Sequence, residues 1–304
     1  MTTRTDLAME NLDRGADALP GVDVRRWEEG GITMTEVIVR TEEAADALGK
    51  PCGNYLTMEC PLLREHDPDA RLAMSNLIGS ELTRLLTPSE SAPVMVVGLG
   101  NRSVTPDALG PAAVDKTLVT RHIMDSEFSQ SSLRSVCAIA PGVLGVTGIE
   151  TVELVESLVK ALHPRAVLCI DSLAARDWSR IGCAVQISST GIQPGSGVGN
   201  HRRPLTRESL GVDVVALGVP TVIYAATLAR DAFALREGGV DASDHEAALH
   251  ALESELLDTD LGNCIVTPRD IDAIVKNCAT MISGGINRAL QPTLSAAEIA
   301  EMMD

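Results

Sequence analysis

Short, wholly apolar runs alternate along this chain with segments whose apolar residues recur at helical spacing. The runs at 94–97, 166–170 and 214–217 contain no charged residue, whereas 70–87 and 151–162 repeat apolar residues every three or four positions. Strands without polar alternation are buried on both faces, which requires a sheet covered by helices on each side. We therefore predict an α/β fold with a mostly parallel sheet and helices on both faces.

The same patterns predict further strands at 135–140 and 184–187 and further helices at 221–230, 244–257, 268–282 and 295–303. A helix is also expected to begin at Thr105, because Thr is a favourable N-cap and Pro106 a favourable first helical residue. Residues 1–35 are polar and of mixed charge, so we expect a flexible leader that passes into an edge element. No linker divides the remaining chain, which predicts one domain.

Composition argues against several classes of function. The 304 residues carry a formal net charge of −17 and only 2% aromatic residues. Nucleic acid is bound by concentrated Lys and Arg and by stacked aromatic rings, so neither nucleic acid nor an anionic membrane is an expected partner. We expect no signal peptide, and the longest uncharged run, 214–229, is shorter than the roughly 20 residues that span a bilayer.

Cysteine and histidine patterns do not predict a metal or cofactor. The seven cysteines contain no Cys-x-x-Cys and are interpreted as reduced thiols in a cytosolic protein. On a helix His245 and His250 would point about 140° apart, too far for one metal ion. The basic cluster His201-Arg202-Arg203 is either a solvated surface or a site for an acidic partner. The sequence also has no G-x-S-x-G motif and no P-loop.

Two aspartates are predicted at the carboxyl ends of strands. Asp107 follows the 94–97 strand after a glycine-rich turn, and Asp171 directly follows the 166–170 strand. Open parallel sheets bind ligands beyond these ends. Two close carboxylates share one proton, so the ionised one can activate water while the protonated one polarises an amide carbonyl. The residues alone leave an alternative, in which Asp107 stabilises a helix dipole and Asp171 caps a turn.

Motifs in a fixed order link these aspartates to a known family. They are R-T-D-L-A-M-E at 4–10, V-G-L-G-N at 97–101, T-P-D-A-L-G-P at 105–111, A-I-A-P-G-V-L-G at 138–145, T-G-I-E-T at 147–151, D-S-L-A-A-R at 171–176, T-G-I-Q-P-G-S-G-V-G-N at 190–200, G-V-P-T-V at 218–222, V-T-P-R-D-I-D at 266–272 and I-S-G-G-I-N at 282–287. Together they resemble the spore germination protease family, from residue 4 to about residue 292.

The resemblance implies an endopeptidase that initiates degradation of small acid-soluble spore proteins during germination. It implies an unusual aspartic-type protease without a cofactor, with Asp107 and Asp171 as its catalytic pair. The implied fold is similar to that of the hydrogenase maturation endopeptidases. The implied assembly is a homotetramer, and the implied location is the cytoplasm of the forespore and the spore core.

The resemblance also implies a zymogen that removes its own N-terminal segment. The family cuts after an acidic residue in a Thr-Glu-[Phe/Ile]-Ala-x-Glu context, and residues 5–10 read Thr-Asp-Leu-Ala-Met-Glu. We therefore predict a cut between Asp6 and Leu7, which gives a propeptide at 1–6 and a single protease domain at 7–304. The candidates for a substrate-binding role are Asn101, which would orient water or a carboxylate, and the basic residues Arg176, Arg202 and Arg203.

Three other functions fit the same residues. The first is a metal-dependent maturation-type endopeptidase, in which His122, His163 or His201 approaches the aspartates in space. The second is a non-catalytic binding protein, because a fold alone does not establish catalysis. The third is a nucleoside-handling enzyme of similar topology.

Overall fold

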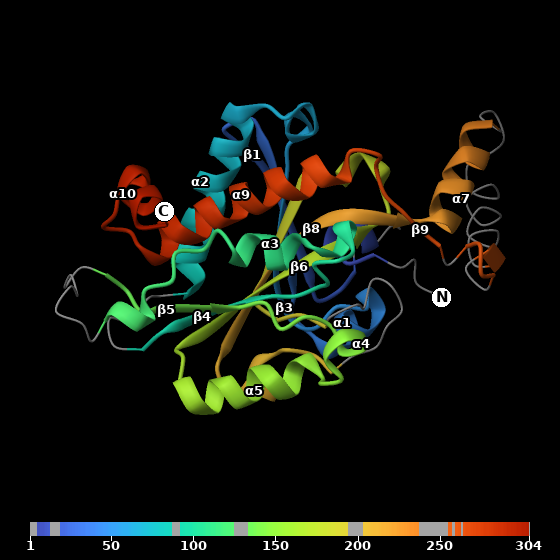
Figure 1. The fold of residues 1–304 in the computed structure, drawn as a ribbon. Coiled ribbons are helices and arrows are strands. Elements are labelled where there is room, and N and C mark those ends of the chain that lie inside the picture. Colours follow the sequence, from blue (N-terminus) through green and yellow to red (C-terminus); the bar gives the residue numbers. More distant parts are fainter. Residues whose placement is uncertain are drawn as a thin grey trace.

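The protein is described by a computed structural model that covers residues 5–12, 19–86, 92–124, 133–193, 203–236, 255–256, 259–262 and 264–303. One central sheet has the strand order β1-β2-β3-β7-β8-β6-β4-β5, and β9 also pairs with β8. Helices lie on both sides of the sheet (Figure 1). The predicted α/β class, with helices on both faces of a large sheet, is therefore confirmed, and the sheet is mixed.

Parallel pairing is confined to four neighbouring strands. These are β5 (Val136–Ile139), β4 (Val94–Gly98), β6 (Ala166–Ala175) and β8 (Asp213–Tyr224). The long helices α2 (Pro68–Leu86) and α9 (Ile271–Leu290) cover one face with the short α3 (Leu109–Val114), and α5 (Thr151–Leu162) covers the other (Figure 1). Alternate side chains of each strand enter the two apolar layers, so Leu168 packs towards α9 and Val167 towards α5.

Antiparallel strands extend the sheet on the β8 side. These are β1 (Val22–Glu29), β2 (Ile32–Val39), β3 (Gly53–Glu59) and β7 (Ala184–Ser188), and the two-residue β9 (Ile265–Val266) pairs with the far end of β8. β1 is an edge strand, as predicted for the element that follows the leader. The short helix α1 (Glu42–Leu48) packs against this half of the sheet in an apolar cluster with Tyr55 and Leu173.

The leader is not flexible where the structure describes it. Residues 5–12 include the 3-10 helix η1 (Ala8–Asn11), and the side chains of Leu7 and Ala8 are completely buried. Both side chains belong to the cluster that contains Tyr55 and Leu173. The expectation of a flexible leader is wrong for this stretch because its apolar residues pack against the sheet.

Two predicted strand ends are also wrong. β6 continues to Ala175, so Asp171 lies within the strand, and β8 continues to Tyr224, so the segment 221–224 is a strand and helix α7 (Ala225–Arg236) begins after it. The two strands pair side by side as far as Ala175 and Ile223, with one register shift after Leu173. The β-branched residues Thr221, Val222 and Ile223 favour the extended chain here, so the helix begins only after them.

The other helices agree with the sequence patterns in position. α9 begins at Ile271 and runs beyond the predicted end, and α10 covers Ala296–Met303. Most of the helix predicted at 244–257 lies outside the described residues. The remaining short elements are the 3-10 helices η3 (Pro61–Glu65), η4 (Thr105–Asp107), η5 (Arg121–Ile123) and η6 (Trp178–Arg180) and the α-helices α4 (Leu144–Thr147) and α6 (Arg207–Leu210).

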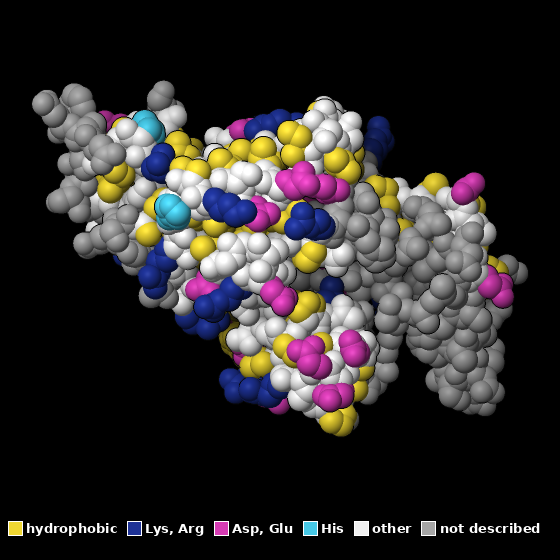
Figure 2. All heavy atoms as spheres, turned by 90° about the horizontal axis from the view of Figure 1, so that it is seen from below, with side chains coloured by type: hydrophobic (Ala, Val, Ile, Leu, Met, Phe, Trp, Pro, Cys, Tyr) yellow, Lys and Arg dark blue, Asp and Glu magenta, His cyan; other side chains and the backbone are white. Residues whose placement is uncertain are grey.

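Surface and thiol chemistry agree with the composition. Acidic, basic and apolar side chains of the described residues are interspersed on the face seen in Figure 2. All seven cysteines are free, and burial raises the pKa of the Cys278 thiol to about 12. Within the described ranges, no helix has both the length and the apolar character that crossing a membrane requires.

Candidate active site

Asp107 lies in η4, on the loop that follows β4. The backbone N–H of Asn101 donates both to the backbone oxygen of Asp107 and to its side-chain Oδ2, each at 2.9 Å. Gly100 has φ +111°, and a Cβ on it would lie 2.0 Å from the same backbone oxygen. Only glycine fits this turn, so the turn fixes the Asp107 carboxylate beside the end of β4.

The helix expected to begin at Thr105 is interrupted. Thr105–Asp107 forms one 3-10 turn without a side-chain cap, and the α-helix α3 begins at Leu109. Pro111 has no N–H to donate to the carbonyl of Asp107, and its ring disfavours a continuous helix at that position. The Asp107 carbonyl is instead satisfied by Asn101.

Asp171 lies on β6, the strand next to β4. The residue is only 7% exposed, and its Oδ1 accepts a hydrogen bond from the Ser172 N–H at 2.9 Å. The N–H of Leu99 donates to the carbonyl of Ile170 at 2.8 Å, so the turn that holds Asp107 also holds β6 next to Asp171. The strands that carry or precede the two aspartates are therefore direct neighbours in the sheet.

Two glycines allow α3 to sit directly on this edge of the sheet. A Cβ on Gly98 would lie 2.3 Å from the carbonyl oxygen of Gly110. A Cβ on Gly110 would lie 2.3 Å from the Leu99 oxygen and 2.6 Å from the Ile170 oxygen. These neighbours are backbone atoms that cannot move independently, so glycine at both positions is what allows α3 to pack against the end of β4 and the middle of β6.

Asp171 on β6 has paired residues beside it on the next two strands, β8 and β7. Gly218 on β8 pairs with Asp171 on one side and with Gln186 on β7 on the other. Directly paired residues point to the same face of a sheet, so Asp171 and Gln186 face the same side with no side chain between them. A Cβ on Gly218 would lie 2.6 Å from the Cγ of Leu173, so the Leu173 side chain occupies the space beside this glycine.

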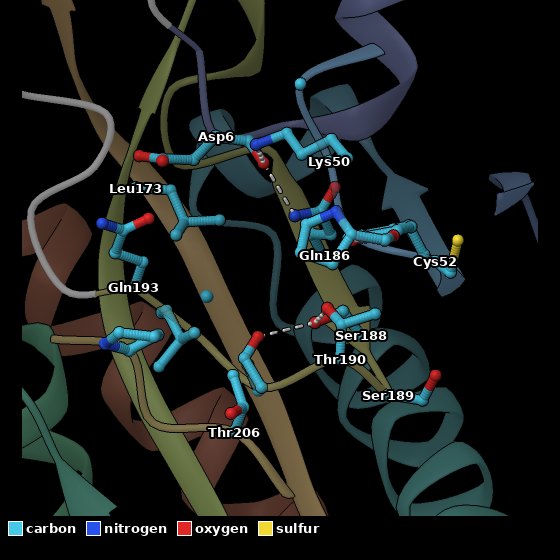
Figure 3. A pocket seen from close by; sticks show the side chains of 18 of the residues that line it. Asp6, Lys50, Cys52, Leu173, Gln186, Ser188, Ser189, Thr190, Gln193 and Thr206 are labelled. Atoms are coloured by element: carbon cyan, nitrogen blue, oxygen red, sulfur yellow. Dashed lines mark hydrogen bonds between the residues drawn. The ribbon is translucent and has the colours of Figure 1, made fainter. Parts of the chain in front are cut away.

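The leader occupies this same face. The Asp6 N–H donates to the Ala174 carbonyl at 2.9 Å, and the Ala174 N–H donates to Asp6 Oδ2 at 2.8 Å. Figure 3 shows Lys50 and Gln186 next to Asp6, and Gln186 Nε2 donates to the Asp6 carbonyl oxygen at 2.9 Å. Thr5 and Asp6 line one side of a cavity of about 900 Å³, which Leu173, Gln186 and Gly218 also line.

Glu10 anchors the other end of the docked segment. Its carboxylate is 1% exposed and accepts hydrogen bonds from the backbone N–H groups of Arg176 and Asp177, at 2.8 and 3.0 Å. Arg180 Nη1 lies 2.9 Å from Glu10 Oε1, and Arg180 Nε lies 2.7 Å from Glu59 Oε1. Burial alone would lower the pKa of Arg180, but the carboxylates of Glu10 and Glu59 raise it on balance. The Thr5 hydroxyl also donates to Glu10.

The structure separates the candidate substrate-binding residues. Asn101 lies at Asp107, whereas Arg176 is placed by its backbone bond to Glu10. Arg203 is exposed, and its charge lowers the pKa of Glu156 on α5, together with the larger effect of Lys160. Arg202 lies outside the described residues, as do His201, His245 and His250 of the sequence patterns. Among the residues that are described, no three His, Cys, Asp or Glu side chains form a group suited to a metal ion.

Sequence reasoning missed Lys50, Gln186 and Arg180. Gln186 gave a usable signal, because it is a polar residue inside the apolar strand 184–187 and is buried in the structure. Lys50 and Arg180 gave none, since each lies in a polar turn and approaches the leader only through tertiary packing.

Asp107 follows β4 and Asp171 lies on the neighbouring strand β6, in a parallel part of the sheet of the kind at which α/β proteins bind ligands. The sequence profile described as germination protease matches residues 3–257. A germination protease of Caldanaerobacter subterraneus subsp. tengcongensis is 42% identical over 99% of this chain and 98% of its own length. Those of Clostridium tetani and Priestia megaterium are 40% and 36% identical, over 98% and 95% of this chain and 98% and 94% of their own lengths. The chain belongs to the germination protease family, and it is therefore a peptidase, a class of hydrolase.

Proposed function

We propose that this chain is an endopeptidase that initiates degradation of small acid-soluble spore proteins, with Asp107 and Asp171 as an aspartic-type acid/base pair. The observation that carries the proposal is the turn at 99–101, which hydrogen-bonds to Asp107 on one side and to Ile170, next to Asp171, on the other. The family supplies the peptidase class. The spore core, where such substrates occur, is the proposed location.

In the proposed reaction one carboxylate takes a proton from water and the other, protonated, donates to the carbonyl oxygen of the substrate. Asp171 is largely buried, and burial disfavours the charged form of a carboxyl group. A state in which only one of the two carboxyls is ionised is therefore favoured. The water oxygen then bonds to the carbonyl carbon. The carbon–nitrogen bond breaks as the first carboxyl passes the proton that it took from water to the amide nitrogen, and the amine leaves. Asn101 supports the proposal as the residue that orients the Asp107 carboxylate.

We further propose that the leader makes the chain a zymogen. Residues 5 and 6 line the cavity, and Leu7 and Ala8 are buried beside them, so the segment occupies space that a substrate backbone would need. A cut between Asp6 and Leu7 would release the part before the bond. Residues 7–12 would stay attached through their apolar packing and the Glu10 carboxylate.

Substrate cleavage tests the proposed activity directly. The self-processed chain, incubated with a purified small acid-soluble spore protein, is expected to cut it once, after a Glu, because the acidic residue before the cut corresponds to Asp6. Mass spectrometry of the two fragments locates the bond. Asp107→Asn, prepared without residues 1–6 so that self-processing is not needed, should leave the spore protein intact. An uncut spore protein with active, processed wild-type enzyme would refute the substrate class.

N-terminal sequencing tests the proposed self-processing. After mild acidification, the full-length chain is expected to lose residues 1–6 and to begin at Leu7. The rate should be independent of protein concentration if the cut is made within one chain. A new terminus at any other residue would show that the bond was wrongly assigned, and Asp171→Asn, which should not process, controls for contaminating proteases.

A homotetramer is part of the proposal, and apolar side chains are available for it. Val104, Leu144, Val146 and Ile149 are exposed on the loops that follow β4 and β5, and Val146 is 71% exposed. Such side chains at the rim of a site serve either subunit contact or substrate contact. Light scattering of the purified chain measures the assembly.

A further inference from the structure

The carbonyl group of Asp6 is bound by two side-chain donors. Lys50 Nζ donates to this oxygen at 3.0 Å and Gln186 Nε2 donates to it at 2.9 Å. Lys50 Nζ also donates to the carbonyl oxygen of Thr5 at 3.2 Å. A carbonyl oxygen that accepts two side-chain donors is polarised towards the negative charge that it acquires when a nucleophile adds to its carbon. Burial lowers the pKa of Lys50, and the charges of Asp6 and Glu10 act in the opposite direction.

Gln186 holds the backbone on both sides of the Asp6–Leu7 bond. Its Nε2 binds the carbonyl before the bond, and its Oε1 accepts a hydrogen bond from the Ala8 N–H at 2.8 Å. Leu7 between these two contacts is extended, with φ −81° and ψ 119°. The nitrogen and the oxygen of the buried Gln186 amide thus bind the main chain on either side of Leu7. A neighbouring β-strand would bind an extended peptide with the same kind of donor and acceptor.

The same face of the sheet carries Asp171. Gln186 and Asp171 flank Gly218, and adjacent strands are roughly 4.8 Å apart, so the two Cα atoms are about 10 Å apart across a residue with no side chain. Leu173, two residues after Asp171 and therefore on its face, packs in one cluster with Leu7 and Ala8. The bound peptide and the carboxylate consequently lie over the same part of the sheet.

We propose that Lys50 and Gln186 form the carbonyl-binding part of the active site, which positions the bond to be cut and shares with the protonated carboxyl the stabilisation of negative charge on its oxygen. The inference rests on the proposed cut between Asp6 and Leu7. Water adds through its oxygen to the carbonyl carbon of Asp6, and the C–N bond to Leu7 breaks. One water proton ends on the Leu7 amine, and the remaining hydroxyl becomes part of the new Asp6 carboxyl group.

Self-cleavage of the full-length chain tests the two donors separately. Lys50→Met removes the amine donor, and Gln186→Glu removes the donor to Asp6 but keeps an oxygen for the Ala8 N–H. Removing one donor of this kind typically lowers the rate about 10²–10³-fold, which is the expected result for each variant. Lys50→Arg, which restores an N–H donor, should regain most of the rate. Lys160→Met on α5, where Lys160 pairs with Glu156 at the surface, is the matched control and should process normally.

Hydrogen exchange of the Ala8 amide separates polarisation of the carbonyl from simple docking of the leader. Slow cleavage with a protected Ala8 amide, and a melting temperature near that of the wild type, supports the inference. Cleavage at the wild-type rate overturns it, and so does slow cleavage with an unprotected Ala8, because release of the leader then explains the loss. If one variant does not fold, the other decides. A wild-type chain that never cuts after Asp6 refutes the proposed self-processing itself.

Discussion

Replacing Asp171 by Asn is expected to lower the peptidase rate by about 10²–10⁴-fold, the usual contribution of a general acid or base. The change removes the ionisable group but keeps the size of the side chain. It also keeps an Oδ1 atom that can accept the hydrogen bond from the Ser172 N–H. Asp107→Asn should lower the rate by the same order, because it also removes an ionisable group. The amide oxygen can still accept the hydrogen bond from the Asn101 N–H. The measurement is the initial rate at which chains prepared without residues 1–6 cleave a spore-protein substrate, because neither variant is expected to remove its own leader.

Asp115→Asn is the matched control for these two variants. Asp115 follows α3 and forms an exposed ion pair with Arg102, whose hydrogen bond lowers the pKa of Asp115. Removing an exposed ion pair changes stability by no more than about 1 kcal/mol, so this variant should retain its activity. Full activity in Asp107→Asn or Asp171→Asn, with unchanged circular dichroism, would eliminate that residue as a catalytic acid or base.

The sequence predicted the parallel half of the fold better than the antiparallel half. Runs such as 166–170 are apolar throughout, because they are buried on both faces. Their patterns did not give the order of the strands in the sheet, in which β6 pairs with β4 although β5 lies between them in the sequence. Strand ends were less predictable. β6 and β8 continue past 170 and 217 because each is the partner of the other, and no local pattern records that pairing.

The leader shows most clearly what a local reading cannot detect. Residues 5–10 are polar enough to look disordered, yet Leu7 fits an apolar cluster made by strands that follow much later in the chain. The contacts of Gln186 with Asp6 and Ala8 join residues 180 and 178 positions apart. Lys50 and Arg180 became candidates only when the fold had brought them to the same segment.

Replacing Arg180 by Met is expected to reduce the free energy of unfolding by about 3–5 kcal/mol, because it leaves a buried carboxylate without its cation. Glu10 is 1% exposed and Arg180 is 15% exposed, so water cannot easily replace the lost partner. The backbone N–H groups of Arg176 and Asp177 remain as neutral donors and offset part of the loss. Denaturant unfolding of the full-length chain, monitored by circular dichroism, measures the change.

A cycle with Glu10→Gln identifies the cause. Because Glu10→Gln removes the buried charge, the double variant should be less destabilised than the sum of the two single variants. Arg207→Met, which breaks the exposed pair with Asp213, should change the stability by less than about 1 kcal/mol. Strict additivity in the cycle would show that Arg180 stabilises the fold through Glu59 and its packing alone. Coupling would instead show that the Arg180–Glu10 ion pair stabilises the fold. It would thereby support a role for this pair in holding residues 7–12 on the sheet after the cut between Asp6 and Leu7.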